Sequence, residues 1–117
     1  MRRALLALSI LLAATCREQT PGYALIGDPA RGHLLVGRYG CASCHVIPGA
    51  SERGLVGPSL DRMAERRYVA GHFPNVPQNL IEWIRFPEQL KPNTAMPDLG
   101  VGDRDARDIA AYLYTLR

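Results

Sequence analysis

The sequence predicts an all-α domain in which a few short helices are joined by unusually long loops. Apolar residues recur at helical spacing in several segments, and no segment shows the alternation of a half-buried strand. Prolines and glycines gather between these segments, and loops of that length in a small domain usually wrap around something. A chain of 117 residues has room for one domain. We therefore expect about four to five helices around a core that is too small to be stable without an additional stabilising element such as a cross-link or a bound group.

The first 15 residues have the pattern of a secretory signal peptide, and residues 16–27 that of a polar tether. A pair of arginines precedes an apolar run from Ala4 to Ala14, which is the order of a basic and then a hydrophobic region. As a helix this run covers about 17 Å, against roughly 30 Å of hydrocarbon, so it is too short to span a bilayer. We expect the globular domain at residues 28–117. Removal of the signal lowers the formal net charge from +3 to +1, which gives no reason to expect nucleic acid as a partner.

Two helices are expected in the first half of the domain. The first begins at Asp28, because a carboxylate N-cap followed by proline at the first helical position favours a helix start. It should end near Gly40. A second, short helix is expected after Ser59, which can cap it. The expected apolar positions of these helices are Leu34, Leu35, Tyr39, Leu60, Met63 and Ala64.

Two further helices are expected in the second half. One ends before Pro87, because proline disfavours the helical conformation in the residue before it. The last opens near Gly102, with Asp103 and Asp105 in its first turn, where carboxylates suit the helix dipole. The expected apolar positions are Leu80, Ile81, Trp83, Ile84, Ile109, Tyr112, Leu113 and Leu116. Loops are expected over residues 46–58, 72–78 and 91–102.

Cys41, Cys44 and His45 form a Cys-x-x-Cys-His sequence, the strongest chemical signal in the chain. Two thiols at this spacing can add to the two vinyl groups of one haem while the imidazole that follows reaches the iron. A zinc site needs four ligands, and the remaining histidines and Cys16 are in no paired spacing. A thioredoxin-like dithiol needs a βαβ context, and no strands are visible. The motif therefore predicts one covalently attached haem c.

Met96 is the expected second axial ligand of the iron. It lies in a proline-rich polar loop, where core packing explains a methionine less well than it does on a helix face. Met63 falls on a helical apolar stripe and is expected in the core. His72 competes with Met96 as a ligand, although an unassigned histidine is more often a surface or hydrogen-bonded residue. His33, on the first helix, is expected to face solvent.

The sequence resembles the class I monohaem cytochromes c from about Asp28 to Leu116. Four blocks carry the resemblance: Cys41-Ala-Ser-Cys-His45, Gly57-Pro-Ser-Leu60, Pro92-Asn-Thr-Ala-Met96 and Asp108-Ile-Ala-Ala-Tyr-Leu113. The resemblance implies a small cytochrome c fold whose helices and long loops wrap around one haem. It also implies thioethers at the two cysteines and axial coordination by the histidine and methionine of these blocks.

The resemblance implies roles for four more residues. Pro58 lies where the family's proline carbonyl accepts the Nδ1 proton of His45, which fixes the ring and makes it a better donor. Leu60 belongs to the same block and is expected at the cofactor. Thr94 falls where the family places a hydroxyl bonded to a haem propionate. Trp83 is similar in position to an aromatic residue on the methionine side, with simple core packing as the alternative.

Gly32 and Tyr112 resemble the pair at which the terminal helices of the family cross. The glycine would allow the two backbones to approach closely. The spacing from this glycine to Cys41 differs by one residue from that of mitochondrial-type members.

Cys16 ends an Ala-Ala-Thr-Cys sequence that resembles a bacterial lipoprotein cleavage box, with threonine where glycine or alanine is more usual. In such proteins the cysteine is lipidated and becomes residue one, and its acyl chains attach the protein to the membrane. The alternative is an ordinary cleaved signal, with Cys16 lost or left as a free thiol. We therefore expect an exported protein on the periplasmic side of a bacterial membrane, lipid-anchored or otherwise soluble in the periplasm.

Taken together, these features predict an electron-transfer protein and not an enzyme. A histidine and a methionine fill both axial positions, leave no place for substrate or dioxygen, and raise the reduction potential. Transfer is expected to be outer-sphere, through the exposed haem edge, to transient redox protein partners. Two alternatives stay open. One is a haem subunit held permanently in a dehydrogenase or terminal-oxidase complex, and the other is a small haem peroxidase or gas-binding protein if Met96 leaves the iron.

Overall fold

The computed structural model describes residue 22 and residues 26–50 and 53–117. The expected signal peptide, Cys16 and most of the tether lie outside the described residues. The elements are, in chain order, α1 (Pro29–Arg38), the 3-10 turns η2 (Cys41–Ser43) and η3 (Met63–Glu65), β1 (Tyr68–Val69), β2 (Phe73–Pro74), α2 (Pro77–Arg85), α3 (Pro87–Leu90) and α4 (Asp103–Leu113). The helical character is confirmed, and none of the helices in this part of the chain has the length and apolarity to cross a membrane.

The capped start of the first helix is confirmed. The Asp28 carboxylate accepts hydrogen bonds from the backbone N–H groups of Ala30 (2.9 Å) and Arg31 (3.1 Å), and Pro29 occupies the first helical position. The expected apolar face is wrong at one position: Leu34 is 72 % exposed, whereas Leu35 is buried. The buried side of α1 runs along residues 32, 35 and 36, so residue 34 lies on the solvent side of the helix.

A short antiparallel hairpin corrects the expectation that the chain contains no strand. β1 and β2 pair Tyr68 with Pro74 and Val69 with Phe73. The turn between them uses two residues with positive φ, Ala70 (51°) and Gly71 (84°). Each strand has two residues, which is too few for an alternating pattern to stand out in the sequence. The expected loop over 72–78 is therefore in part a strand, and its last residues belong to α2.

The prediction of a short helix after Ser59 is also wrong in its extent. The structure has a single 3-10 turn, η3, that follows Arg62, whose φ of 50° is left-handed and interrupts any α-helix through this segment. Ser59 does not cap η3, and its Oγ instead accepts a hydrogen bond from the Asp61 N–H (3.1 Å). Met63 lies in the core with 5 % exposure, as expected, while Leu60 is partly buried against it.

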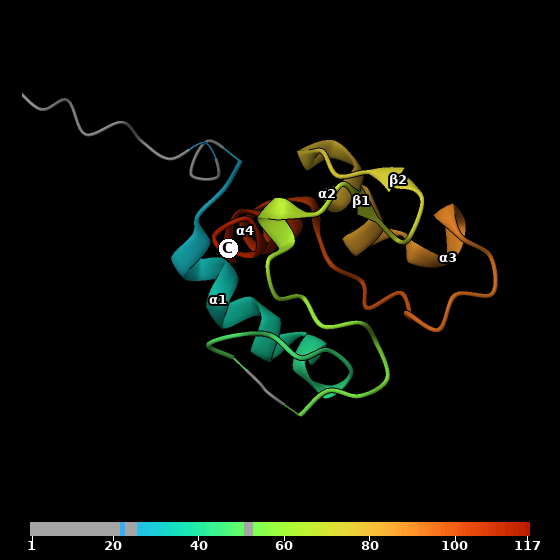
Figure 1. The fold of residues 1–117 in the computed structure, drawn as a ribbon, viewed down its shortest axis with the longest axis horizontal. Coiled ribbons are helices and arrows are strands. Elements are labelled where there is room, and N and C mark those ends of the chain that lie inside the picture. The colour runs from blue at the N-terminus through green and yellow to red at the C-terminus, as the bar shows by residue number, and fades with distance from the viewer. Residues whose placement is uncertain (1–21, 23–25, 51–52) are drawn as a thin grey trace, which may run out of the picture.

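α1 and α4 lie side by side and form the centre of the fold (Figure 1). A Cβ atom placed on Gly32 would lie 1.9 Å from the Asp108 carbonyl oxygen and 2.8 Å from the Tyr112 Cβ. Only glycine permits this approach, so the predicted crossing of the terminal helices at Gly32 and Tyr112 is confirmed. The remaining core residues are Leu35, Val36, Ile47, Met63, Val69, Leu80, Ile81, Ile84, Val101, Ala106, Ile109, Ala110 and Leu113.

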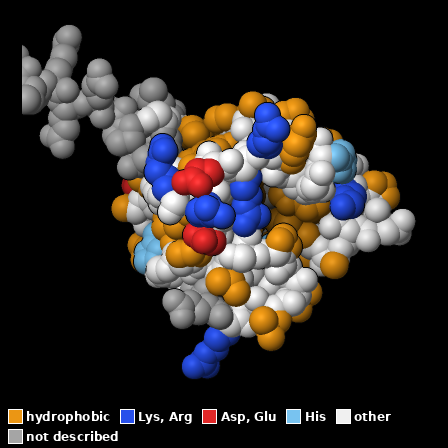
Figure 2. Space-filling model, in the orientation of Figure 1, with side chains coloured by type: hydrophobic (Ala, Val, Ile, Leu, Met, Phe, Trp, Pro, Cys, Tyr) orange, Lys and Arg blue, Asp and Glu red, His pale blue; other side chains and the backbone are white. Residues whose placement is uncertain are grey.

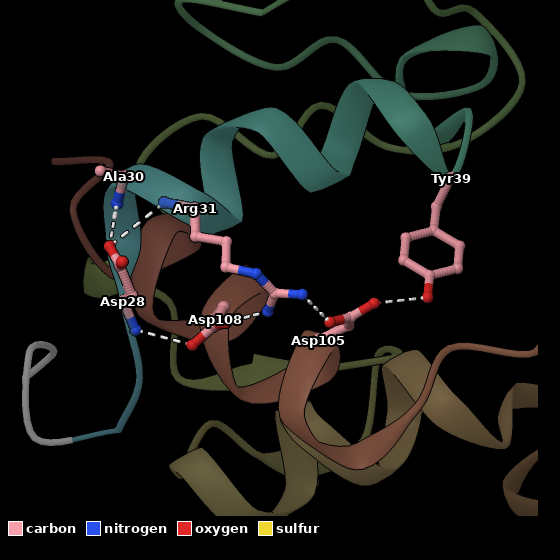
Figure 3. Close-up of polar contacts among 6 residues, drawn as sticks. All are labelled: Asp28, Ala30, Arg31, Tyr39, Asp105 and Asp108. Carbon is pink, nitrogen blue, oxygen red and sulfur yellow. Dashed lines mark hydrogen bonds and ion pairs between the residues drawn. The ribbon is translucent and has the colours of Figure 1, made fainter.

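A polar clasp joins the same two helices on their outer side (Figure 3). Arg31 donates hydrogen bonds to Asp105 and Asp108, and the Tyr39 hydroxyl donates to Asp105 (2.7 Å). Asp108 is buried and also accepts a hydrogen bond from the Asp28 N–H (2.7 Å), so it ties the entry of α1 to α4. The hydrogen bond from Tyr39, followed by that from Arg31, lowers the pKa of Asp105 below its usual value.

Long loops lie outside this helical centre. In Figure 1, residues 53–62 (green) and 91–102 (orange) run as extended segments at the periphery, and the second leads back into α4. The face drawn in Figure 2 carries acidic and basic side chains close to one another, with hydrophobic side chains between them. This face therefore has no broad field of a single sign, in keeping with the small net charge expected for the domain.

Candidate haem site

The cysteines of the motif lie at the end of α1, where the chain turns. Gly40 has a φ of 73°, a conformation that suits glycine and allows the chain to leave the helix and enter η2. Within this turn the Cys44 N–H and the His45 N–H both donate to the Cys41 carbonyl, at 3.2 and 3.0 Å. The two cysteines are half-buried free thiols. Burial, more than the neighbouring Cys44, raises the pKa of the Cys41 thiol, so this group is held in its neutral form.

His45 is fixed by a hydrogen bond through one ring nitrogen. Its Nδ1 donates to the Pro58 carbonyl at 2.7 Å, since a carbonyl can only accept. In a neutral ring with the proton on Nδ1, Nε2 carries the lone pair and can bind a metal. The contact between Pro58 and His45 is the one that the family resemblance implies.

Two glycines let the chain close over this histidine. A Cβ atom on Gly57 would lie 2.4 Å from the His45 Cε1, and one on Gly54 would lie 2.3 Å from the His45 carbonyl carbon. Backbone hydrogen bonds hold the same segment, from the Gly57 N–H to the Cys44 carbonyl (2.8 Å) and from Val56 to the same oxygen (3.2 Å). The sequence analysis did not single out these two glycines as site residues. Their signal was present as Gly-Leu-Val-Gly-Pro beside the motif, but its meaning depends on where the loop folds.

Leu55 and Val56 project from this segment into solvent, with exposures of 92 % and 71 %. Because the backbone on either side is held against Cys44 and His45, these side chains cannot turn inward. The segment over His45 therefore presents apolar side chains outward while its backbone packs on the histidine.

Met96 and Thr94 lie half-buried in the loop between α3 and α4. The Thr94 Oγ1 accepts a hydrogen bond from the Met96 N–H at 3.3 Å, and the Thr94 N–H donates to the Lys91 carbonyl at 3.1 Å. Asn93 has a φ of 65°, which bends the chain at this point. The loop is thus shaped by local bonds around the methionine. Trp83 on α2 is half-buried, whereas the other apolar positions expected on this helix are buried.

The other two histidines occupy different surroundings. His72 is exposed at the hairpin turn, where its Nδ1 donates to the Ala70 carbonyl (3.3 Å) and its ring lies 4.0 Å from that of Phe73. His33 is exposed on α1, as expected, and it also has a partner that the sequence did not reveal. Its Nε2 donates to the Gly49 carbonyl at 3.0 Å, so it helps to hold the chain that follows the motif.

The residues at the motif fit a covalent haem. Two free thiols stand three residues apart, and the imidazole that follows has its Nδ1 engaged with Pro58, so Nε2 is the ring nitrogen left for a metal. In the described part of the chain, no group of three or more histidine, cysteine, aspartate or glutamate residues could hold a metal ion. A bare zinc ion would therefore lack ligands here, whereas a haem iron needs only two from the protein.

Comparison with known proteins agrees with this chemistry. The family model of cytochrome c matches residues 29–117. The chain is 31 % identical over 88 residues to cytochrome c oxidase subunit 2 of Alkalihalophilus pseudofirmus, a match that covers 74 % of this chain and 25 % of that protein. The chain thus corresponds to about a quarter of the length of this relative. Since the family model covers most of the sequence, the chain belongs to the cytochrome c family, as a class I member of this group of haem-based electron-transfer proteins.

Proposed function

We propose that this protein is a monohaem electron carrier in which His45 and Met96 are the axial ligands of the iron. The observation that carries the proposal is the 2.7 Å hydrogen bond from the His45 Nδ1 to the Pro58 carbonyl. It keeps the proton on Nδ1 and leaves Nε2 as the donor atom, and it raises the basicity of the ring. When bound, the haem supplies an iron that cycles between Fe(II) and Fe(III).

Cys41 and Cys44 are the residues that would hold the group covalently, through one thioether each. Both are free thiols, and both lie on a turn whose backbone is bonded to itself. Each thioether forms when the thiol S–H adds across a vinyl group, so no oxidant is consumed. Two such bonds next to His45 fix the imidazole relative to the attached ring.

Three observations favour Met96 as the second axial ligand. Of the three methionines, Met1 belongs to the proposed signal peptide and Met63 is buried in the protein core. Met96 is half-buried in a loop shaped by its own hydrogen bond to Thr94. His72, the competing ligand, is exposed at the hairpin turn, where its ring lies against that of Phe73. In this proposal Leu60 and Trp83 line the cofactor, and the Thr94 hydroxyl bonds a propionate.

With both axial positions filled by side chains, the proposed chemistry is outer-sphere electron transfer and no step needs a general acid or a nucleophile. The protein's contribution is to hold His45 and Met96 in place in both oxidation states and to keep water from the iron. Donor and acceptor are redox proteins that bind transiently.

The proposal extends to where the protein works. Residues 1–15 act as an export signal, Cys16 carries the lipid, and residues 16–27 tether a domain of residues 28–117 on the periplasmic side of the membrane. The intact mass of the mature N-terminus tests this. Acylation of Cys16 as the first residue is expected, and a mature chain that begins elsewhere, or there without acyl groups, contradicts it.

A second candidate is a haem subunit held permanently in a terminal-oxidase complex. It is favoured by the similarity of this chain to a quarter of a cytochrome c oxidase subunit 2. Extraction in mild detergent separates the two candidates, since a fixed subunit co-purifies with oxidase subunits and a carrier does not.

The axial ligands are tested by Met96→Ala. The oxidised wild-type protein is expected to show the far-red absorption band that reports a methionine–iron bond, and the variant should lose it and bind added imidazole. Met63→Leu, which keeps the core volume, is the matched control and should retain the band. Survival of the band in Met96→Ala would show that another residue is the ligand.

A further inference from the structure

We propose that Arg66 is a positioning residue for His45. It fixes the peptide that follows Pro58 and so holds the Pro58 carbonyl against the Nδ1 of the histidine. The inference rests on the proposed function, in which this histidine is an axial ligand, and it adds a residue for which the sequence analysis gave no role.

The guanidinium of Arg66 donates hydrogen bonds to backbone carbonyls. Its Nη2 donates to the Ser59 carbonyl and to the Asp61 carbonyl (2.8 Å), and its Nε donates to Asp61 as well (3.2 Å). It forms no ion pair with any residue that the structure describes. Hydrogen bonds from a charged donor are about twice as strong as neutral ones. The planar fork therefore clamps the turn from residue 59 to residue 61.

This clamp acts one residue beyond the Pro58 carbonyl. The peptide group between Ser59 and Leu60 is planar, and it is held at both of its polar atoms. Arg66 binds its oxygen, and the Val46 carbonyl accepts from its N–H at 2.8 Å. A peptide held at both edges cannot rotate, so the backbone that leaves Pro58 has a fixed direction.

On the other side of Pro58, a backbone hydrogen bond from the preceding residue holds the chain. The Gly57 N–H donates to the Cys44 carbonyl at 2.8 Å, and the Pro58 carbonyl then reaches His45. Proline itself fixes one of its two backbone angles. Two side chains donate among these bonds, His45 to Pro58 and Arg66 to Ser59 and Asp61, and the other donors that hold the segment are backbone N–H groups. The contribution of Arg66 can therefore be removed by substitution without deleting backbone atoms.

Arg66 is itself anchored to the helical centre. The Asn75 side chain donates to the Arg66 carbonyl (2.9 Å) and to the Met63 carbonyl (2.8 Å), and its Oδ1 accepts from the Tyr114 hydroxyl (2.8 Å). Burial raises the pKa of Tyr114 to about 12, so this hydroxyl keeps its proton through neutral and moderately alkaline pH. A chain of hydrogen bonds thus runs from the residue after α4 to the turn that holds His45.

The surface beside the clamp does not suggest a competing role for the guanidinium. An open cavity of about 320 Å³ there is lined by Ser59, Asp61, Arg62, Glu65 and Arg66. That lining carries two carboxylates and two guanidinium groups, so its formal charges cancel and it favours neither a cation nor an anion. The hydrogen bonds that the structure shows for the Arg66 guanidinium go to the backbone of its own chain.

The experiment measures solvent exchange of the His45 Nδ1 proton in the reduced holoprotein, by NMR with ¹⁵N-labelled histidine. Arg66→Ala is expected to accelerate exchange by about tenfold, because hydrogen bonds from a charged group are lost. Arg67→Ala is the matched control. It removes an exposed cation from the next position, and it should leave the exchange rate unchanged.

Arg66→Lys distinguishes the hydrogen-bond geometry of the guanidinium from its charge, because lysine keeps the positive charge but lacks the planar set of donors. It should also exchange faster than the wild type, by a smaller factor than Arg66→Ala. If the His45 Nδ1 proton of Arg66→Ala exchanges at the wild-type rate, the proposal is overturned. It is also overturned if the backbone amides of α4 accelerate by the same factor as this proton, because that would show a loss of overall stability. If Arg66→Ala yields no holoprotein, unchanged exchange in Arg66→Lys overturns it. Failure of the proposed function is distinct, since it appears in the wild type as absent covalent haem or in Met96→Ala as a persistent far-red band.

Discussion

His45 is held at its ring by the Pro58 carbonyl and is closely covered by Gly54 and Gly57. Cys41, Cys44 and His45 are recognisable from spacing alone, because the chemistry needs those residue types in that order. The hydrogen bond to Pro58 followed from family resemblance, and the structure has it at 2.7 Å. The close packing of Gly57 on the ring could not be predicted from the residues, because it depends on where a loop of 13 residues returns.

At this scale, Gly57→Ala should displace the segment from His45. The new Cβ would lie 2.4 Å from the ring Cε1, and in the proposed site the ring, as an iron ligand, would not be free to move away. We expect the free energy of unfolding of the holoprotein to fall by about 1–3 kcal/mol, with faster exchange of the His45 Nδ1 proton. Denaturant titration measures the first effect. Gly102→Ala, where a Cβ meets nothing within 4 Å, is the control and should change little.

At the scale of elements, prediction succeeded where a local signal determines the structure. Asp28 and Pro29 mark the start of α1 because capping is a contact between near neighbours. The hairpin of β1 and β2 was missed, because two-residue strands have no period and are held by partners elsewhere in the chain. Leu34 was placed on the wrong side of α1 because apolar character alone does not say which residues face α4.

The crossing of α1 and α4 predicts that alanine substitutions at two glycines of α1 have opposite effects on the free energy of unfolding. Gly32→Ala places a Cβ 1.9 Å from a backbone oxygen of α4, and two packed backbones cannot yield cheaply. We expect a loss of about 3 kcal/mol or more in the free energy of unfolding. Gly37→Ala on the same helix meets nothing within 4 Å and should stabilise by up to about 1 kcal/mol. Equal effects of the two substitutions in denaturant titrations would contradict the crossing.

The clasp between the same helices predicts a dependence on pH. The pKa of Asp105 is lowered by the hydrogen bond from Tyr39 and then by that from Arg31. A carboxyl group whose pKa is lowered by folding stabilises the fold above its ordinary value, and this contribution is lost as the pH falls through the lowered value. Asp105→Asn should therefore reduce the free energy of unfolding at neutral pH, and the gap to the wild type should close as the pH falls below the ordinary carboxyl pKa of about 4 and through the lowered pKa of Asp105. Glu88→Gln, on α3, is the control. A gap for Asp105→Asn that is independent of pH would show that its charge is not responsible.

At the scale of the whole molecule, composition and length predicted a small helical domain with loops too long for its core. The structure agrees, since the buried apolar residues come mainly from α1, α2 and α4 while the loops over 53–62 and 91–102 are largely exposed. The arrangement of these loops could not be predicted from the sequence, because it depends on contacts between residues that are far apart in the chain. The family resemblance implies that the loops close around a cofactor.

Replacing Cys41 and Cys44 together with alanine tests this dependence of the fold on the haem. The two thiols are the groups that would form the covalent bonds, so the double variant should carry no covalent haem. Without it, the half-buried side chains of Thr94 and Met96 lose the surface they would pack against, and a core of this size is marginal by itself. We expect circular dichroism to show loss of most helical signal and no cooperative thermal transition. The double serine variant, which is closer in size and polarity to cysteine, should behave alike. A sharp thermal transition in either variant would mean that α1, α2 and α4 form a sufficient core, and that the long loops are not there to enclose a haem.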